Sequence, residues 1–441
     1  MEPIAWLTLI IFSLAIIAVL ANVIEPAVAA LLGVGVMVWA GIMTETDAFL
    51  FVDWNVMAIL VSVWIIAGYF GKSGVPELLS AKAMQWSGGH YGMLVVILSL
   101  LAGMLSIVVD NVVVILMLAP VAIPVVRQLG FPLTPVVLMI GFSANFMGTA
   151  LLLGDLPPQM LHSVSGAEFL DFIWQHGRPS SFPILMVTFA ITLGFMYMYG
   201  FRTAGAASGT GGGSAGADTR MEVPKLADPL LAWLVIGGFT ATIVAMAFRE
   251  VLDVKLGFIA MTGALILIAV VEVLGDRLKK KPDFEEILQE LDWRAVFFYI
   301  ALFALVGGLE KVGILHDLAG LLKPIFASSV TLGTSLLYWV TIPIVGVVEH
   351  DAYILTFLYT IRDLGEAGID PWPLWWMLVW SGTLGSNFTV AGAPALYVAL
   401  NICEREEQRK ISLREFLGWS VPFTLVASVI CYVFGMLIWV L

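Results

Sequence analysis

The sequence predicts an all-α polytopic membrane protein made of two inverted repeats. Three observations lead to this prediction: an apolar composition, recurring apolar runs of membrane-spanning length, and an internal repeat. Of the 441 residues, 60% are hydrophobic and 12% are charged, and the mean hydropathy is +0.98. Soluble domains carry about 25% charged residues. The low charge indicates that most of the chain faces lipid or other apolar helices.

Apolar runs of roughly 20 residues, long enough to cross the ~30 Å apolar core of a bilayer, recur along the chain. They are continuous and do not alternate with polar residues, which favours helices over a β-barrel. Each half is expected to hold three membrane helices, a re-entrant hairpin, an interrupted helix and a closing helix. In the first half these segments are 4–21, 26–43, 54–70, 91–127, 135–172 and 181–201. In the second half they are 228–247, 255–274, 294–310, 326–362, 373–402 and 418–440.

The two halves share a sequence repeat. Asp53-Trp54 recurs 239 residues later as Asp292-Trp293, and the same offset places Asp110-Asn111 on Glu349-His350. After a slip of one residue, Gly154 falls on Gly392. One register held over about 100 residues indicates an internal duplication. The predicted domains are a first repeat at 1–202, a Gly/Ser-rich linker at 203–228 and a second repeat at 229–441.

The distribution of Lys and Arg predicts the orientation. With the N-terminus outside, most cations of the loops fall on the inner side, which satisfies the positive-inside rule. Both termini then lie outside, the linker lies in the cytoplasm, and the second half is inverted relative to the first. Inverted repeats are typical of secondary transporters, whose sites lie near the midplane at broken helices. A multi-pass transporter in the inner or plasma membrane is therefore expected.

Ionisable residues lie inside the apolar hairpins and, in the case of Asp155, at the break of the first interrupted helix. An ionisable side chain in a membrane segment is costly and is a candidate functional residue. The alternative is a solvated loop between two full-length helices. The residues expected to couple transport to protons are Asp110, Asp155, Glu349, His350 and Asp351.

Glycines and prolines break one helix in each half. Small hydroxyl and amide side chains near such breaks replace lost backbone hydrogen bonds or bind a ligand. The alternative is close helix packing through small residues. The residues expected to bind substrate are Asn111, Asn145, Gly148, Thr149, Gly154, Ser386, Asn387, Thr389 and Gly392.

Other functions lack support in the sequence. Cys403 and Cys431 form no metal-ligand pattern, so neither a metal site nor a cofactor is predicted. The five histidines are scattered, which argues against an enzyme, and so few cations argue against nucleic acid as a partner. The expected partners are a small inorganic solute, protons and the lipid bilayer.

The motif segments resemble the ArsB/NhaD branch of the ion transporter superfamily along nearly the whole chain. The stretch from Asp110 to Val121 is similar to the family pattern D-N-V-T-T-V-L-L-L-A-P-V. The stretch from Asn145 to Gln159 is similar to N-I-G-G-T-A-T-A-I-G-D-P-P-N, but it has Leu156 between the Asp and the two prolines and Gln in place of the last Asn. Another departure is Glu349-His350-Asp351, where many relatives have V-D-N-I-P-F.

The resemblance implies one of three solutes. Arsenite or antimonite is a neutral trihydroxide that needs hydrogen-bond partners and a proton relay, and for such permeases an ATPase subunit is a further partner. Sodium exchanged for protons needs carboxylate and carbonyl oxygens. A di- or tricarboxylate lacks a countercharge in the motif segments unless cations bind with it, because these segments contain no Lys or Arg. The sequence prediction is proton-coupled arsenite or antimonite efflux, with a sodium/proton antiporter and a cation-coupled anion permease as alternatives.

Overall fold

The computed structural model describes residues 3–21, 24–88, 90–128, 130–201, 226, 228–279, 281–348 and 350–441, and most of them lie in helices. Within these residues, six helices are long and apolar enough to cross a membrane. Their bounds are Trp54–Lys72, Ser181–Phe201, Pro229–Ala247, Leu256–Val273, Trp293–Lys311 and Leu413–Val440. The chain is an all-α polytopic membrane protein, so this part of the prediction is confirmed.

Two long central helices, α4 (Trp54–Lys72) and α16 (Trp293–Lys311), begin and end at matching positions of the sequence repeat. The carboxylates of Asp53 and Asp292 accept hydrogen bonds from backbone amides in the first turn of these helices. A carboxylate at this position satisfies amides that have no partner within the helix. The recurring Asp-Trp pair therefore marks a helix start in each half.

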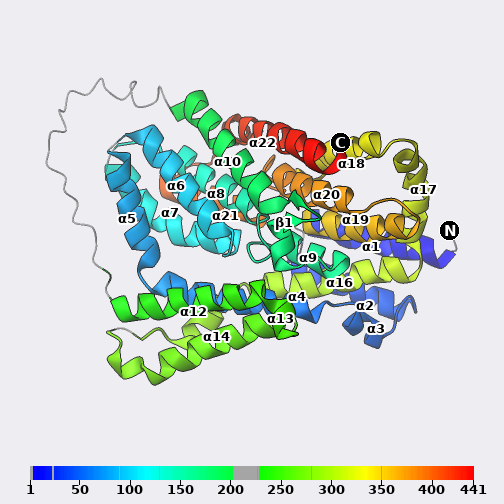
Figure 1. The fold of residues 1–441 in the computed structure, drawn as a ribbon, viewed down its shortest axis with the longest axis horizontal. Helices are drawn as coiled ribbons and strands as arrows, with labels where there is room; N and C mark the ends of the chain where they lie inside the picture. The colour runs from blue at the N-terminus through cyan, green and yellow to red at the C-terminus, as the bar shows by residue number, and fades with distance from the viewer. Residues whose placement is uncertain are drawn as a thin grey trace.

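A glycine redirects the chain after each of these helices. Gly74 and Gly313 both have a φ of 77°, in the region that glycine adopts without strain. The helices that follow, α5 (Val75–Ser87) and α17 (Ile314–Ser328), lie across opposite ends of the molecule, steeply inclined to the long helices (Figure 1). The segments expected from the sequence omit α5 and most of α17, because the mixed composition of these two helices does not resemble a membrane span. We expect such helices to lie at the membrane surfaces.

Each half continues with a hairpin of short helices. The first consists of α6 (Tyr91–Ser106) and α7 (Asn111–Gln128), and the second of α18 (Val330–Val345) and α19 (His350–Glu366). A helix of 16 to 18 residues is about 24–27 Å long, shorter than the ~30 Å apolar core. The hairpins enter from opposite ends of the molecule (Figure 1), so their tips lie within it, as expected of re-entrant hairpins.

An interrupted helix follows each hairpin. The helical pieces are α8 (Leu133–Met147) and α9 (Leu156–Ser165) in the first half, and α20 (Trp372–Ser386) and α21 (Pro394–Glu407) in the second. Every residue of α8 is buried, and α20 is buried from its second residue onward. Non-helical backbone at membrane depth is tolerated where protein surrounds it or where it lines a cavity. The breaks therefore lie in the part of the fold that can accept them.

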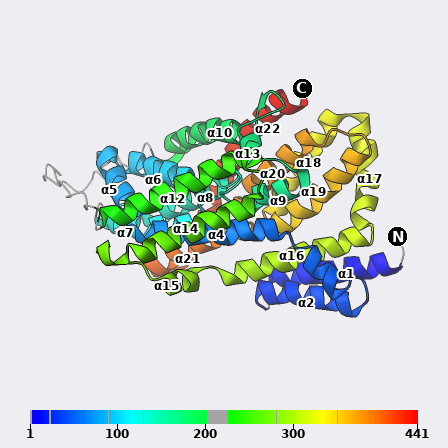
Figure 2. The same cartoon turned by 60° about the horizontal axis from the view of Figure 1, so that its bottom comes forward.

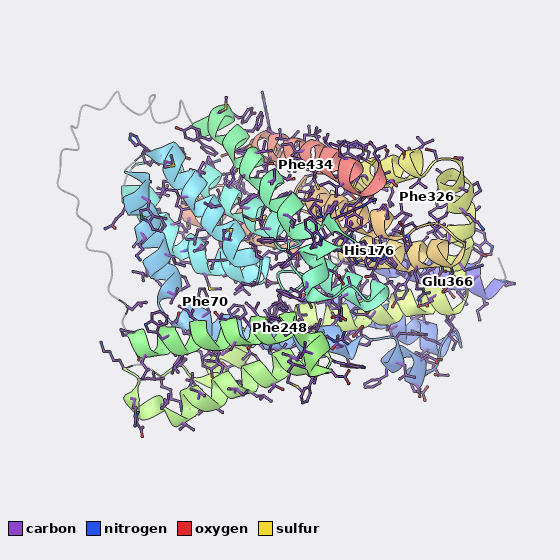
Figure 3. The ribbon with its side chains drawn as sticks, viewed as in Figure 1. Phe70, His176, Phe248, Phe326, Glu366 and Phe434 are labelled. Atoms are coloured by element: carbon purple, nitrogen blue, oxygen red, sulfur yellow. The ribbon has the colours of Figure 1, made fainter. Side chains whose placement is uncertain are left out.

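The remaining helices group beside α4 and α16. They are α1 (Pro3–Ala21), α2 (Pro26–Trp39), α3 (Glu45–Leu50), α12 (Pro229–Ala247), α13 (Arg249–Leu252), α14 (Leu256–Val273), the 3-10 turn η4 (Gly275–Arg277) and α15 (Phe284–Glu290). Helices α1 and α2 pack on α16, and α12 and α14 pack on α4, as both ribbon views show (Figures 1 and 2). Their outer surface is apolar; Phe248, for example, is 58% exposed (Figure 3).

Two closing helices pack against each other on the other side of the molecule. They are α10 (Ser181–Met196), which continues as the π-helix η2 (Tyr197–Phe201), and α22 (Leu413–Gly435), which continues as the π-helix η5 (Met436–Val440). Before α10 come the 3-10 helix η1 (Phe169–Phe172) and the antiparallel strands β1 (Trp174–Gln175) and β2 (Arg178–Pro179). The turn between these strands places the ring of His176 5.5 Å from that of Trp372 (Figure 3).

The structure corrects two expected segments. Those expected at 26–43 and 135–172 end earlier, because Gly41 and Gly166 follow the helices with φ values of 73° and 74°. Most of the linker at 203–228 lies outside the described residues. The opposite membrane orientation of the two halves stays a prediction.

Candidate functional site

A cavity of about 1110 Å³ extends from the end of the molecule where α5 begins to the tips of both hairpins. Residues of both tips and both helix breaks line its inner wall: Asp110, Asn111, Asp155, His350, Asp351 and Ala393. The structure thus brings the four segments singled out in the sequence to one cavity.

The tip of the first hairpin and the first helix break are joined by amide hydrogen bonds. The Asn111 Nδ2 atom donates to the Asn145 Oδ1 atom at 3.0 Å and to the Asp155 Oδ2 atom at 2.9 Å. The other Asp155 oxygen accepts from the Leu156 amide at 2.9 Å and so caps α9. Asp110 caps α7 in the same way, through the amides of the next turn. Both carboxylates therefore sit at helix N-termini, where negative charge is stabilised.

A second set of hydrogen bonds joins the two halves. The Asn145 Nδ2 atom donates to the Ser386 Oγ atom at 2.9 Å and to the Asn387 Oδ1 atom at 3.2 Å. Beside them, the Thr149 hydroxyl donates to the Thr383 hydroxyl at 2.6 Å. All five side chains are at most 1% exposed. Because Asn145 also accepts from the first hairpin, one amide connects the hairpin tip to the break of the opposite half.

The second hairpin contributes a histidine and a carboxylate. The His350 Nε2 atom lies 3.4 Å from the Asp351 Oδ1 atom, and both side chains are buried and line the cavity. Glu349, expected from the sequence to be the counterpart of Asp110, lies outside the described residues. The tip of the second hairpin therefore presents an imidazole and a carboxylate, where the tip of the first hairpin presents the carboxamide of Asn111.

The glycines of the breaks have a packing role. A Cβ on Gly154 would lie 2.2 Å from the carbonyl oxygen of Ser106, and a Cβ on Gly392 would lie 2.2 Å from that of Ser386. Gly148 has a milder constraint, since its Cβ would lie 3.0 Å from the Asp155 Cβ. Backbone segments approach one another at these positions more closely than any side chain permits.

Thr389 lies apart from the Asn145 network. Its hydroxyl donates to the carbonyl oxygen of Gly346, which joins the second break to the second hairpin. The sequence analysis missed Thr383, although the repeat register places it opposite Asn145. It also missed Ser181, whose hydroxyl donates to the Thr149 carbonyl at 2.9 Å. No pattern in the sequence marks this serine, because it is an ordinary residue at a helix start.

The mouth of the cavity is acidic. Glu77, Glu290 and Asp292 line it together with two cations, Lys72 and Arg294. The Lys72 Nζ atom lies 2.7 Å from Glu286 and 2.6 Å from Glu290, so its charge is offset locally. Arg294 lies 3.8 Å from the carboxylate of Glu25. The described cations of the cavity are therefore paired with acids.

Polar contacts hold the opposite end of α4 against α9. The Ser163 hydroxyl donates to the carboxylate of Asp53, and the Asn55 Nδ2 atom lies 3.3 Å from the His162 Nε2 atom. Nearby, Arg249 forms an ion pair with Glu168. The matching end of α16 faces α21 across the cavity mouth. The molecule is thus open beside Asp292 and closed beside Asp53.

The sequence profile of the citrate transporter family, CitMHS, matches residues 7–381. The chain belongs to the citrate transporter family. The sequence resemblance pointed to the ArsB/NhaD branch of the ion transporter superfamily; the profile supports the superfamily and indicates the citrate transporter family, and it does not support the ArsB/NhaD branch. Membership makes the protein a membrane transporter and not an enzyme.

Relatives of this citrate transporter family member cover most of its length. An uncharacterized transporter of Mycobacterium tuberculosis is 26% identical over 445 residues, covering 96% of both chains. An uncharacterized transporter of Synechocystis is 22% identical and covers 95% of this chain and 94% of its own. The magnetosome protein MamN of Magnetospirillum gryphiswaldense is 26% identical and covers 87% of this chain and 86% of its own.

Proposed function

We propose that the protein is a secondary active transporter that carries a small carboxylate together with a bound cation. One observation carries the proposal. The N-terminus of α21 lines the cavity without a side-chain cap, and it does so in a cavity whose walls are acidic. Such a site has one place for an anionic group and another for a cation.

The place for the anion follows from a comparison of the two halves. In the first half, the carboxylate of Asp155 caps α9. The corresponding position in the second half is Ala393, the N-cap residue of α21, which has no side-chain oxygen. Free amides at a helix N-terminus bind anions readily. Asp155 accepts from the amide of Leu156, the first residue of α9, whereas the first residue of α21 is Pro394, which has no N–H. A carboxylate of the solute would therefore bind at the N-terminus of α21 through the next amide, that of Ala395.

The place for the cation follows from the acids. Asp110, Asp155 and Asp351 line the inner wall, so a bare anion would be repelled on its way to α21. A cation bound to the solute removes this repulsion. Among the described residues, no group of three or more His, Cys, Asp or Glu is arranged to hold a metal ion. The cation would therefore keep carboxylate oxygens of the solute as ligands, and the family description names a citrate transporter.

A second candidate is the proton-coupled efflux of arsenite or antimonite. The buried network of Asn145, Thr149 and Asn387 supports it, because a neutral trihydroxide needs donors and acceptors and no countercharge. A sodium/proton antiporter would rely on the same carboxylates. In both cases Asp110, His350 or Glu349 would carry the proton.

Uptake into proteoliposomes tests the proposal. We expect radiolabelled citrate to accumulate when magnesium is present and to stop accumulating when EDTA removes it. Ala393→Asp should abolish this uptake, because the new carboxylate caps α21 in place of the solute. Ala391→Asp adds the same charge to the cavity without capping α21 and should retain most of the uptake. The proposal is wrong if citrate stays outside with every cation while arsenite or sodium is transported.

A further inference from the structure

His162 lies on α9 at the closed end of the molecule, about 10 Å along the helix from the break at Asp155. Its half-buried ring has a contact on each nitrogen. The Nδ1 atom lies 2.7 Å from the carbonyl oxygen of Ala167, just beyond α9. The Nε2 atom lies 3.3 Å from the Nδ2 atom of Asn55 on α4. The ring therefore connects the helix that follows the first break to one of the two long central helices.

These two contacts determine which protonation state of the ring fits. The carbonyl oxygen of Ala167 can only accept a hydrogen bond, so the Nδ1 atom of His162 must carry a hydrogen. The Asn55 Nδ2 atom can only donate, so the Nε2 atom must offer a lone pair. A neutral imidazole with its hydrogen on Nδ1 satisfies both contacts. The charged ring carries hydrogens on both nitrogens and would place a donor against the donor of Asn55.

Asn55 cannot turn to accept from a charged ring without a loss elsewhere. Its Oδ1 atom accepts from the Gly257 amide at 2.8 Å, at the start of α14. Exchanging the oxygen and the nitrogen of the side chain would bring two donors together at Gly257. The helices are also close here, since a Cβ on Gly257 would lie 2.5 Å from the backbone carbonyl oxygen of Asn55. Charging the ring therefore costs one hydrogen bond whichever way the amide points.

The acids near this end have partners of their own. The charged and titratable groups on the elements around this part of α9 are Asp53 of α4, Glu168 and Asp171 after α9, Arg249 of α13, Lys255 before α14, and Tyr359, Arg362 and Asp363 of α19. Helix α20 carries none. Asp53 accepts from Ser163, Glu168 pairs with Arg249, Asp171 accepts from the Glu168 amide, and Asp363 pairs with Arg362. The contacts of the ring nitrogens with Ala167 and Asn55 therefore decide which form of the ring fits.

We propose that His162 is a proton-sensitive latch that keeps the end of the molecule beside Asp53 closed. The neutral ring holds α9 against α4 and α14, and the charged ring loses this contact. Histidine is the side chain that changes charge between about pH 5 and 8. A conformation that requires the neutral ring becomes less populated as the pH falls, so acid favours the conformation that is open beside Asp53. The latch acts on the conformational equilibrium of the transporter, so it goes beyond the proposed function and applies to any solute.

Labelling of a cysteine in the cavity tests the latch without a solute. Ala295→Cys places the cysteine on the wall of the cavity, whereas the native Cys403 and Cys431 are buried. The rate of reaction with a methanethiosulfonate reagent is measured on the purified full-length protein in detergent, between about pH 5 and 8. Each rate is divided by the rate of the same protein carrying His162→Gln, which cancels the pH dependence of the thiol itself.

His162→Gln offers an acceptor oxygen to Asn55 and takes up no proton, so its latch should hold at every pH. Relative to this variant, the protein with His162 should react roughly fivefold more slowly at the acid end, the lower limit for an unpaired buried group. His162→Lys carries a permanent charge and should react slowly throughout. Asn55→Asp still accepts from the Gly257 amide and offers an oxygen to the charged ring, so the slowing in acid should disappear.

His176→Gln is the matched control, because it removes a histidine that contacts Trp372 and not Asn55, and it should keep the slowing in acid. The variants are compared as folded protein with equal size-exclusion profiles. The inference is overturned if the ratio to His162→Gln does not change with pH, or if His162→Lys reacts as fast as His162→Gln. It is also overturned if Asn55→Asp slows in acid as the protein with Asn55 does, or if His176→Gln removes the slowing.

Discussion

Asn145→Ala tests whether the amide network between the halves contributes to the solute site. The change removes the donor to Ser386 and Asn387 and the acceptor of Asn111. Asn111 retains Asp155 as a partner, whereas the Asn387 Oδ1 atom loses the donor at 3.2 Å. An unpaired buried acceptor costs about 1–3 kcal/mol, which corresponds to a loss of affinity of roughly 5- to 150-fold if the cost falls on the bound state.

The assay compares the apparent KM for uptake in proteoliposomes that contain equal amounts of folded protein. Ser143→Ala is the matched control, because Ser143 lies two residues earlier on α8, is fully buried, and has a hydroxyl without a partner among the described residues. Its removal should leave KM unchanged. The reasoning is refuted if Asn145→Ala and Ser143→Ala behave alike, or if Asn145→Ala lowers only the yield of folded protein.

Three further outcomes are expected. Gly154→Ala should abolish folded protein on fluorescence-detected size exclusion, since its Cβ would meet the Ser106 carbonyl oxygen at 2.2 Å. Gly237→Ala is the control, since a Cβ at Gly237 would have no atom within 4 Å, and this variant should fold like the wild type. Similar size-exclusion profiles for the two variants would contradict the proposed packing role of Gly154. Arg249→Ala removes the ion pair with Glu168 that helps close the end beside Asp53. The variant should therefore favour the conformation that is open beside Asp53 and closed beside Asp292, by about 1 kcal/mol, roughly fivefold. A cysteine placed at the cavity mouth would then react more slowly, and an unchanged rate would exclude this role. A cysteine in the linker between the repeats should resist an impermeant reagent added to whole cells, and labelling would reverse the assigned orientation.

The sequence analysis located most of the residues that the structure brings to the cavity and its hydrogen-bond network, because their signals are chemical and local. Charged and amide residues are conspicuous in apolar segments, and this contrast identified Asp110, Asn111 and Asn145 without any coordinates. Thr383 and Gln159 escaped because their importance depends on what they face. Thr383 is one of many hydroxyl residues, and only the structure shows that the Gln159 oxygen is buried without a hydrogen-bond partner among the described residues.

Helices that span the membrane were predictable, because long apolar runs identify them. Helices with mixed polar and apolar surfaces were not. The spans of α4, α12 and α14 follow from runs that only a bilayer accommodates. The helices α5 and α17 have mixed surfaces and lie across the ends of the bundle, a placement that depends on tertiary contacts and on the glycine turns before them. The solute could not be read from the sequence for a related reason. Motif residues show which groups are present, whereas the proposed carboxylate site depends on which helix termini in the cavity lack side-chain caps, and this is known only from the structure.

The two halves have similar backbone geometry at their helix breaks but different side chains beside them, and these two features have separate causes. Gly154 and Gly392 occupy matching places, since each break brings two backbone segments too close for a side chain. This geometric requirement applies to each half alone, so the duplication retains it. The residues that follow, Asp155 and Ala393, line a shared cavity, in which the proposed solute would meet both halves at once. A small solute with unlike groups is bound better by unlike walls, so a capped helix N-terminus on one side and an uncapped one on the other is the arrangement that a cation-bound carboxylate requires.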